Sequence, residues 1–433
     1  MDPLSISLIG FTAILSLAFW RFPLALAMGL VGVIGFGEMS GYRAAISNLG
    51  RLVMDLGQSY SLSVLPLFIL MGLLVEKGGM AKQLYRAAYA FLGDKKGGLA
   101  MSTVVACGMF SAISGSSIAT AATMSKVAMP EMRRYKYADS LATASIAAGG
   151  TLGILIPPSV ILVIYGLLTE QSIGKLFMAG FIPGFIGILF YTLAVKFVVT
   201  RDATLGPAGE RTAWKDRLIA LRDVWTTLVL FIFVIGGIYI GLFSATEAAG
   251  MGAAGALLIT YFKGALSRKV LLEVGREAAL LAAKLFALLF GASMFSNFLN
   301  RAGLPDALMG FINSFELSGI SVIFIILLIY LLLGCVFESM SMILLTVPIF
   351  APLVQQLGFD LIWFGILVVV VTEISLITPP IGLNVFVLKG VIKDVSVSTI
   401  FKGVTPFWIA DIIRLILLTA IPALSLFLPS LMA

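Results

Sequence analysis

The sequence predicts an all-α polytopic membrane protein made of two inverted-topology repeats, each with a re-entrant hairpin and a broken helix. Three observations support this fold class. The 433 residues are 60% hydrophobic and only 12% charged, with a mean hydropathy of +1.08. Apolar runs long enough to cross ~30 Å of hydrocarbon recur from end to end, and we expect about ten to twelve spans or part-spans. Breaks in these runs fall at equivalent places in the two halves of the chain.

The composition excludes several classes of function. The chain has no histidine, which removes the commonest general base and metal ligand and argues against haem sites, zincin sites and Ser-His proteolysis. Its two cysteines, Cys107 and Cys335, lie in apolar runs, so we expect packed thiols and no disulfide. The net charge of +7 lies mostly in loops, where it indicates orientation in a membrane and not binding of nucleic acid. The first apolar run lacks a basic leader and a small-residue cleavage site, so we expect a span and not a signal peptide.

The two halves repeat at an offset of 222 residues. Prolines and serines that interrupt apolar runs align at this offset: Pro157 with Pro379, Pro158 with Pro380, Pro130 with Pro352 and Ser117 with Ser339. In the first half the loops 77–96 and 131–137 are basic, whereas their counterparts hold one arginine or no basic residue. The third pair reverses, because 388–402 holds three lysines and its counterpart 166–175 holds one. Basic loops face the cytoplasm, so equivalent loops face opposite sides, as in secondary transporters with inverted repeats.

One kind of break is a run of small polar residues inside an apolar segment. SAISGSS at 111–117 and GCVFESM at 334–340 both predict a helix that stops, turns and restarts near mid-depth. We expect Ser116 or Ser117 to cap the restarting helix. The dipole of that helix then favours an anion at the centre of the membrane.

The other kind of break is the Pro-Pro pair, at 157–158 and again at 379–380. A proline has no N–H to donate to the carbonyl four residues earlier. The carbonyls released in this way are those of Gly153, Ile154, Ser375 and Leu376. A bare carbonyl in lipid is costly, so it must face protein, water or an ion. A lone pair of prolines is usually only a kink. The repetition at one offset instead predicts two quasi-symmetric cation sites around a central anion site, with uncharged oxygen ligands that suit Na⁺.

Polar side chains within apolar runs supply further candidates. Glu338 lies in the second hairpin tip, and an intramembrane carboxylate is a functional candidate by default. Glu373 is a candidate for proton coupling or for holding a helix end, and Asn384 for lining the site. Lys284 and Arg414 lie in or near apolar runs, and we expect both to snorkel towards water.

Several spaced motifs together resemble one family. They are SGSSIATAATMSKVAMPEM, GGTLGILIPPSVILVIYG, TEQSIGKLFMAGFIPG, ATEAAGMGA, LLTVPIFAPL and ITPPIGLNVFV. In this order they resemble the large membrane subunit (DctM-type permease) of TRAP transporters, over nearly the whole chain. The resemblance implies a Na⁺-coupled, binding-protein-dependent importer of organic acids in a bacterial or archaeal inner membrane, not an enzyme, with Na⁺ as coupling ion and no organic cofactor.

The resemblance also implies partners and an elevator mechanism, in which a transport domain moves against a scaffold. The partners are a periplasmic substrate-binding protein and a small four-helix membrane subunit, which we expect to be a separate chain because no extra four-span segment is evident. The expected division is scaffold and amphipathic arm at 1–60, transport-domain half at 61–199, cytoplasmic linker at 200–222, scaffold and arm at 223–284, and transport-domain half at 285–433.

The site residues follow partly from this resemblance. It places one Na⁺ site on Ser114, Ser116, Gly153, Ile156 and Pro158, and a second on Gly334, Ser375 and Thr378. Our candidates for contact with the substrate carboxylate are Ser116, Ser117, Glu338, Ser339 and Asn384. The family commonly has Asp in the second tip, where this chain has Glu338, one methylene longer.

Three alternatives stay open. A stand-alone Na⁺/carboxylate symporter of a related inverted-repeat fold would need neither small subunit nor binding protein. An intramembrane enzyme would use Ser116 or Ser117 as nucleophile with Lys126 as base, and a channel would conduct without substrate. The sequence does not distinguish among dicarboxylates, sugar acids and keto acids as substrates.

Overall fold

The computed structural model describes residues 3–432, and within that range the chain is α-helical without a β-strand. The helices of the first half are α1 (Pro3–Phe19), α2 (Leu24–Ser40), α3 (Tyr42–Gln58), α4 (Val64–Lys77), α5 (Met80–Leu92), α6 (Gly98–Ser114), α7 (Ser117–Arg134), α8 (Asp139–Thr151), α9 (Val160–Thr169) and α10 (Ile173–Arg201). Those of the second half are α11 (Trp214–Tyr239), α12 (Ala245–Phe262), α13 (Arg268–Ala302), α14 (Leu304–Ser314), α15 (Gly319–Gly334), α16 (Ser339–Gln356), α17 (Leu361–Ser375), α18 (Leu383–Val391), α19 (Val397–Ala420) and α20 (Ala423–Ser430). Three short 3-10 turns are η1 (Tyr60–Ser63), η2 (Leu152–Ile154) and η3 (Ala203–Leu205).

Six helical segments in the described part of the chain are long and apolar enough to cross a membrane. They are Tyr60–Lys77, Ile173–Arg201, Trp214–Tyr239, Arg268–Ala302, Ser339–Gln356 and Val397–Ala420. Six more apolar helices are 10–17 residues long, too short to span alone without tilt or a partner segment. These six candidate spans and six shorter apolar helices match in number the expected ten to twelve spans or part-spans.

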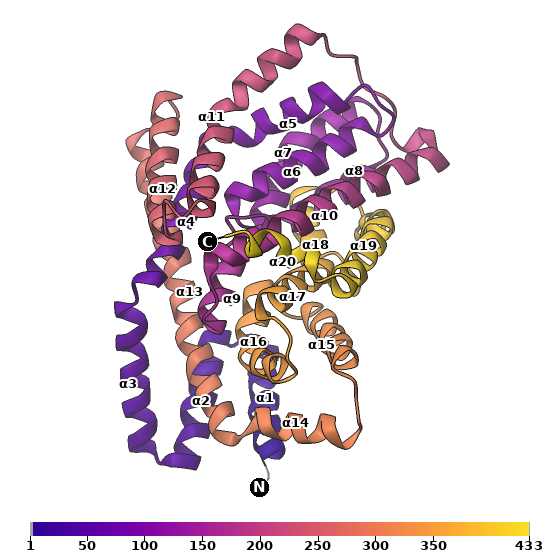
Figure 1. Cartoon of the computed structure of the whole chain (residues 1–433). Coiled ribbons are helices and arrows are strands. Elements are labelled where there is room, and N and C mark those ends of the chain that lie inside the picture. The colour runs from indigo at the N-terminus through magenta and orange to yellow at the C-terminus, as the bar shows by residue number, and fades with distance from the viewer. Residues whose placement is uncertain (1–2, 433) are drawn as a thin grey trace.

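The helices pack in two groups. In the first, α2 packs against α13, α4 against α12 and α13, and α11 against α12. In the second, α8 packs against α6, α7 and α19, and α10 against α19 and α20. Figure 1 shows the first group along one side of the molecule, with α3 at its edge, and the second group beside it. Helix α5 contacts both groups, through α6 and through α11.

Three expected segment boundaries fall inside continuous α-helices: 199/200 lies in α10, 222/223 in α11 and 284/285 in α13. α13 runs unbroken from Arg268 to Ala302, past the expected boundary at 284, because its sequence contains no proline and its ends are set by the Ser267 cap and the left-handed Gly303. α11 begins at Trp214, so the last part of the expected linker 200–222 is helical.

The predicted cytoplasmic segments lie together. The Arg133 guanidinium contacts the Asp394 carboxylate at 2.5 Å, which joins the loop 131–137 to 388–402. The segment after α10 hydrogen-bonds to two other loops, from Gly97 N–H to Gly206 O at 2.8 Å and from Ala138 N–H to Leu205 O at 3.0 Å. The hydrogen bond from Arg133 holds the pKa of the Asp394 carboxyl below its ordinary value. The basic loops that charge alone assigned to one side of the membrane thus share one face of the protein.

Candidate functional site

The first hairpin turns where small polar residues interrupt the apolar run. α6 ends at Ser114, and Gly115 follows with φ +60°, a conformation that favours glycine. Ser116 caps α7, because its hydroxyl accepts a hydrogen bond from the Ala119 N–H at 3.3 Å, so the predicted cap is confirmed. The Ser114 hydroxyl lies 2.8 Å from the Thr120 hydroxyl, which ties the two arms of the hairpin together.

The second hairpin has the same plan with a carboxylate as its cap. α15 ends at Gly334, and α16 restarts at Ser339. The Glu338 carboxylate accepts a hydrogen bond from the Ser341 N–H at 3.3 Å, and the side chain is exposed. A carboxylate at a helix N-terminus is favoured by the helix dipole. Glu338 therefore has a structural role as a cap in addition to its candidacy for substrate binding.

In each Pro-Pro break, a donor from the protein satisfies one of the two freed carbonyls. In the first break the Ile154 carbonyl accepts a hydrogen bond from the Ser159 hydroxyl at 2.5 Å. In the second the Leu376 carbonyl accepts one from the Asn384 N–H at 3.0 Å. Both Pro-Pro bonds are cis. In each half, protein donors thus satisfy the second of the two released carbonyls.

The first released carbonyl of each half is left without a partner. Within residues 3–432, no hydrogen bond reaches the carbonyl oxygen of Gly153 or of Ser375. Gly153 belongs to η2 and Ser375 ends α17, so both lie at the point where the helix breaks. An unpaired buried carbonyl is costly unless water or a cation contacts it. Over the same range, Cys, Asp and Glu side chains form no cluster that could hold a metal ion. A cation site here would consist of carbonyl and hydroxyl oxygens.

Each break packs closely against the hairpin of its own half. A Cβ atom placed on Gly153 would lie 2.9 Å from Ser111 Oγ and 3.4 Å from the carbonyl carbon of Ser116. A Cβ atom on Gly334 would lie 2.1 Å from Ser375 Oγ. The structure therefore brings Gly153 to the first hairpin, and Gly334 together with Ser375, as the two expected Na⁺ sites require.

The remaining site candidates are distributed around these contacts. A Cβ on Gly115 would lie 3.4 Å from the Pro158 carbonyl, which places that carbonyl at the first tip. Ile156 is 8% exposed and its side chain packs against Gly108 of α6 and Gly184 of α10, whereas the Thr378 hydroxyl donates to Ile374 O at 2.6 Å. Asn384 is buried, its Nδ2 donates to Ala147 O of the first half at 3.1 Å, and its Oδ1 has no partner.

The two tips are not joined directly. Among the described residues, no hydrogen bond links Ser116 or Ser117 to Glu338 or Ser339. The two halves contact each other through other helices. α18 of the second half packs on α7 of the first half, and α9 of the first half packs on α16 of the second half. Asn384 is thus the candidate that crosses from one half to the other.

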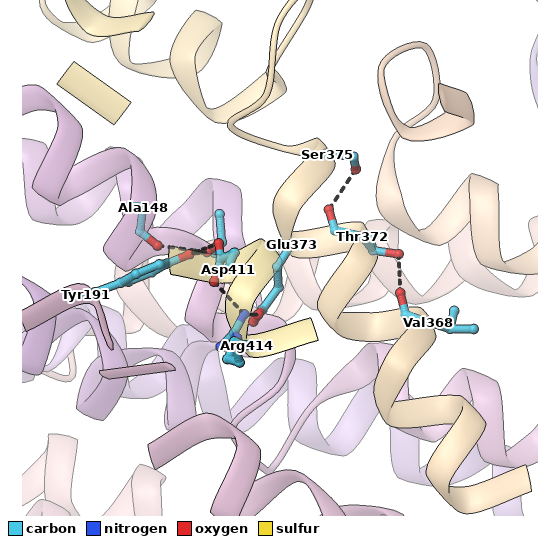
Figure 2. A network of polar contacts seen from close by, with 9 residues as sticks. Ala148, Tyr191, Val368, Thr372, Glu373, Ser375, Asp411 and Arg414 are labelled. Carbon is cyan, nitrogen blue, oxygen red and sulfur yellow. Dashed lines mark hydrogen bonds and ion pairs between the residues drawn. The ribbon is translucent and has the colours of Figure 1, made fainter. Parts of the chain in front are cut away.

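Sequence reasoning missed a buried polar network beside the breaks (Figure 2). Arg414 on α19 contacts Asp411 at 2.9 Å and donates to Glu373 on α17. The Tyr191 hydroxyl on α10 donates to Asp411 and lies 3.1 Å from the Thr151 hydroxyl at the end of α8. All five side chains are 0% exposed.

This network overturns one expectation. Arg414 does not snorkel, because two carboxylates compensate its charge inside the protein and make a path to water unnecessary. The signal was available, since Asp411 and Arg414 are opposite charges spaced i, i+3 on one face of an apolar helix. Ser111 and Thr120 at the first tip were also missed, because serine and threonine in apolar helices commonly bond to their own backbone.

The fold defines a class of protein. The structure is similar to that of MtrF from Neisseria gonorrhoeae, an antimetabolite efflux pump, with a TM-score of 0.64 at 12% identity over 97% of this chain and 95% of that one. At this identity the likeness concerns the fold alone. Together with the apolar helices, it makes the chain an all-helical, multi-pass protein with a membrane transporter fold.

The sequence comparison is more specific. The chain matches the model of the tripartite ATP-independent periplasmic transporter, DctM component, over residues 11–424. It is 36% identical over 392 residues to the C4-dicarboxylate TRAP transporter large permease protein of Pseudomonas aeruginosa, across 89% of this chain and 90% of that protein. It is 31% identical to the ectoine TRAP transporter large permease protein of Halomonas elongata, across 94% and 95% of the two chains. The chain therefore belongs to the DctM family of TRAP transporter large permeases.

Proposed function

We propose that this chain is the large transmembrane subunit of a Na⁺-coupled TRAP importer of organic acids, in the cytoplasmic membrane of a bacterium or archaeon. The observation that carries the proposal is the pair of unpartnered carbonyls at Gly153 and Ser375, 222 positions apart. Gly153 lies against the first hairpin beside the Ser111 hydroxyl, and Ser375 lies against Gly334 of the second hairpin and brings its own hydroxyl. Neutral oxygen ligands of this kind match the preference of Na⁺ for hard donors and leave no fixed charge to trap the ion.

The proposed mechanism is an elevator. The helices α6–α10 and α15–α20 would move as the transport domain, while α1, α2, α4 and α11–α13 would form the scaffold, with α3 as an amphipathic arm along the membrane. The close packing within each group supports this division, in which we assign α4 to the scaffold and not to the transport-domain half 61–199. The matching breaks and hairpins at one offset support an inverted repeat.

The substrate would bind between the two hairpin tips. The N-termini of α7 and α16 carry partial positive charge that favours a carboxylate. Ser116, Ser117, Ser339 and Asn384 would donate hydrogen bonds to it, and Glu338 would contact polar groups elsewhere on the substrate. A periplasmic binding protein would deliver the acid, and a small four-helix subunit would enlarge the scaffold. Relatives act on substrates as different as C4-dicarboxylates and ectoine, so the family alone does not select the acid.

Thermal unfolding of the detergent-purified protein in NaCl, KCl or choline chloride tests the Na⁺ sites. An ion at 100 times its dissociation constant stabilises the fold by ~2.7 kcal/mol, so we expect a Na⁺-specific rise in melting temperature. Pro157→Ala should reduce this rise, because an alanine N–H can donate to the Gly153 carbonyl. Pro130→Ala is the matched control, since Pro130 lies within the unbroken α7. Ser116→Ala should also weaken Na⁺ dependence, with an added loss from the missing cap.

The outcomes separate the possibilities. If the melting temperature rises equally in all three salts, the protein has no Na⁺-specific sites. If both Pro157→Ala and Ser116→Ala keep the native Na⁺ affinity, these two residues do not belong to the Na⁺ sites. Co-purification with a small membrane subunit distinguishes a TRAP permease from a stand-alone Na⁺/carboxylate symporter of related fold.

A further inference from the structure

The buried polar network runs from one helix break to the other. Thr151 is the last residue of α8 and directly precedes η2, which holds Gly153. Glu373 lies in the last turn of α17, two residues before Ser375. Between them the path passes through Tyr191, Asp411 and Arg414, all from helices that follow the breaks. Figure 2 shows Tyr191, Asp411, Arg414 and Glu373 side by side, joined by dashed contacts.

The two ends of the path occupy equivalent positions. Thr151 and Glu373 are 222 residues apart, the same offset that relates the Pro-Pro pairs. The network therefore lies across the junction of the two repeats and connects one half of the chain to the other at the level of both breaks.

The Arg414 guanidinium is packed tightly beside the first break. A Cβ atom on Gly187 of α10 would lie 2.0 Å from Arg414 Nη1 and 2.9 Å from Leu152 Cδ2, so Arg414 packs against bare backbone beside the first break. Of the elements packed on these helices, α6, α9, α15, α16, α20 and η2 contain no acidic or basic residue. Further charges belong to α7, to α11 and to both ends of α10, and the remaining ones are Asp139 of α8, Lys389 of α18 and Lys402 of α19. Replacing a buried ion cluster by apolar side chains of similar volume is often neutral or stabilising, so stability alone does not account for this one.

We propose that Tyr191, Asp411 and Arg414 are positioning residues that couple the two candidate cation sites, so that an ion at one site raises the affinity of the other. The inference rests on the proposed Na⁺ coupling. An ion that draws the Gly153 carbonyl into place also fixes the end of α8 and hence Thr151. Through the network this orders Glu373 and the end of α17, so the second ion meets a Ser375 carbonyl that is already ordered. Coupling of this kind is reciprocal and needs no large movement.

Calorimetric titration of NaCl into Na⁺-free, detergent-purified protein tests the coupling. Tyr191→Phe removes the hydroxyl that joins the two halves and keeps the ring, which packs against Phe407. Thr151→Val removes the hydroxyl that contacts Tyr191, and it replaces Tyr191→Phe in the experiment if that variant fails to fold. Tyr165→Phe is the matched control, because Tyr165 is also 0% exposed and its hydroxyl donates to Leu361 O at 2.6 Å, away from the path.

We expect a Hill coefficient clearly above 1 in the native protein and in Tyr165→Phe, and close to 1 in Tyr191→Phe and Thr151→Val. The Na⁺ concentration that fills the weaker site should rise by about fivefold or more in the latter two. A merely structural role would lower the melting temperature without changing the Hill coefficient.

Each contrary result has its own meaning. A native Hill coefficient of 1, or an unchanged coefficient in both network variants, overturns the coupling and leaves the proposed Na⁺ sites standing. A native protein that gives no heat specific to Na⁺ overturns the proposed Na⁺ coupling, and the inference with it.

Discussion

The contact between the second hairpin and the second break should not tolerate a methyl group. A Cβ on Gly334 would lie 2.1 Å from Ser375 Oγ and 2.3 Å from Ser375 Cβ. Both atoms are close to the Ser375 backbone, so no flexible side chain can swing aside, and α15 or α17 must shift. Overpacking of this kind costs about 1–3 kcal/mol, and we expect Gly334→Ala to lie in the upper part of that range.

Equilibrium unfolding of the detergent-purified protein in choline chloride measures this cost without Na⁺. In a Ser375→Gly background the clashing atoms are gone, so the same substitution should cost close to nothing, which makes the pair strongly non-additive. Gly310→Ala is a suitable control, because no atom lies within 4 Å of its added Cβ in the helical α14 and alanine is the better helix former.

The reasoning fails if Gly334→Ala unfolds within about 0.5 kcal/mol of the native protein, the usual range of harmless surface changes. It also fails if Ser375→Gly leaves the cost of Gly334→Ala undiminished, because the destabilisation would then come from somewhere other than this contact.

The same unfolding measurement checks three other variants. Arg414→Met should lower the free energy of unfolding by about 3–5 kcal/mol, because it leaves two buried carboxylates without a cation. Adding Glu373→Gln and Asp411→Asn should restore most of that stability. A triple variant as unstable as the single one would contradict this account. Gly187→Ala should lose about 1–3 kcal/mol, because its Cβ would lie 2.0 Å from Arg414 Nη1, and a native-like unfolding curve would show that the guanidinium has room to move. Ser159→Ala should lose about 1–2 kcal/mol with faster hydrogen exchange at the start of α9, whereas native exchange there would rule out its role as cap.

The sequence predicted the features that backbone chemistry controls. The restart of α7 at Ser116 follows from the preference of serine for the cap position, and the break after Thr151 follows from the missing N–H groups of two prolines. The gathering of the basic segments on one face followed from charge counting, and Arg133 with Asp394 shows it. The cap and the break are local rules that a few neighbouring residues suffice to apply, and the charge rule needs only the composition of each loop.

The parts that the sequence did not reveal depend on contacts between distant segments. Tyr191 and Asp411 are 220 residues apart, and neither is unusual in its own helix. The uses of the freed carbonyls were equally hidden, because nothing local indicates that Ser159 satisfies Ile154 whereas Gly153 stays free. Such outcomes depend on which helices pack together, and hydropathy and charge do not specify that packing.

The two halves make the same contact with their residues exchanged. In the first half glycine lies on the break and serine on the hairpin, as Gly153 and Ser111, and in the second half glycine lies on the hairpin and serine on the break, as Gly334 and Ser375. Close approach of two backbones needs a missing Cβ on only one side, so either arrangement serves the packing. The free carbonyls are therefore equivalent, but the neighbouring hydroxyl belongs to the hairpin in one half and to the broken helix in the other. Any ion bound at these two places would meet the same main-chain oxygen and a differently anchored hydroxyl, so the two proposed sites are not interchangeable despite their common plan.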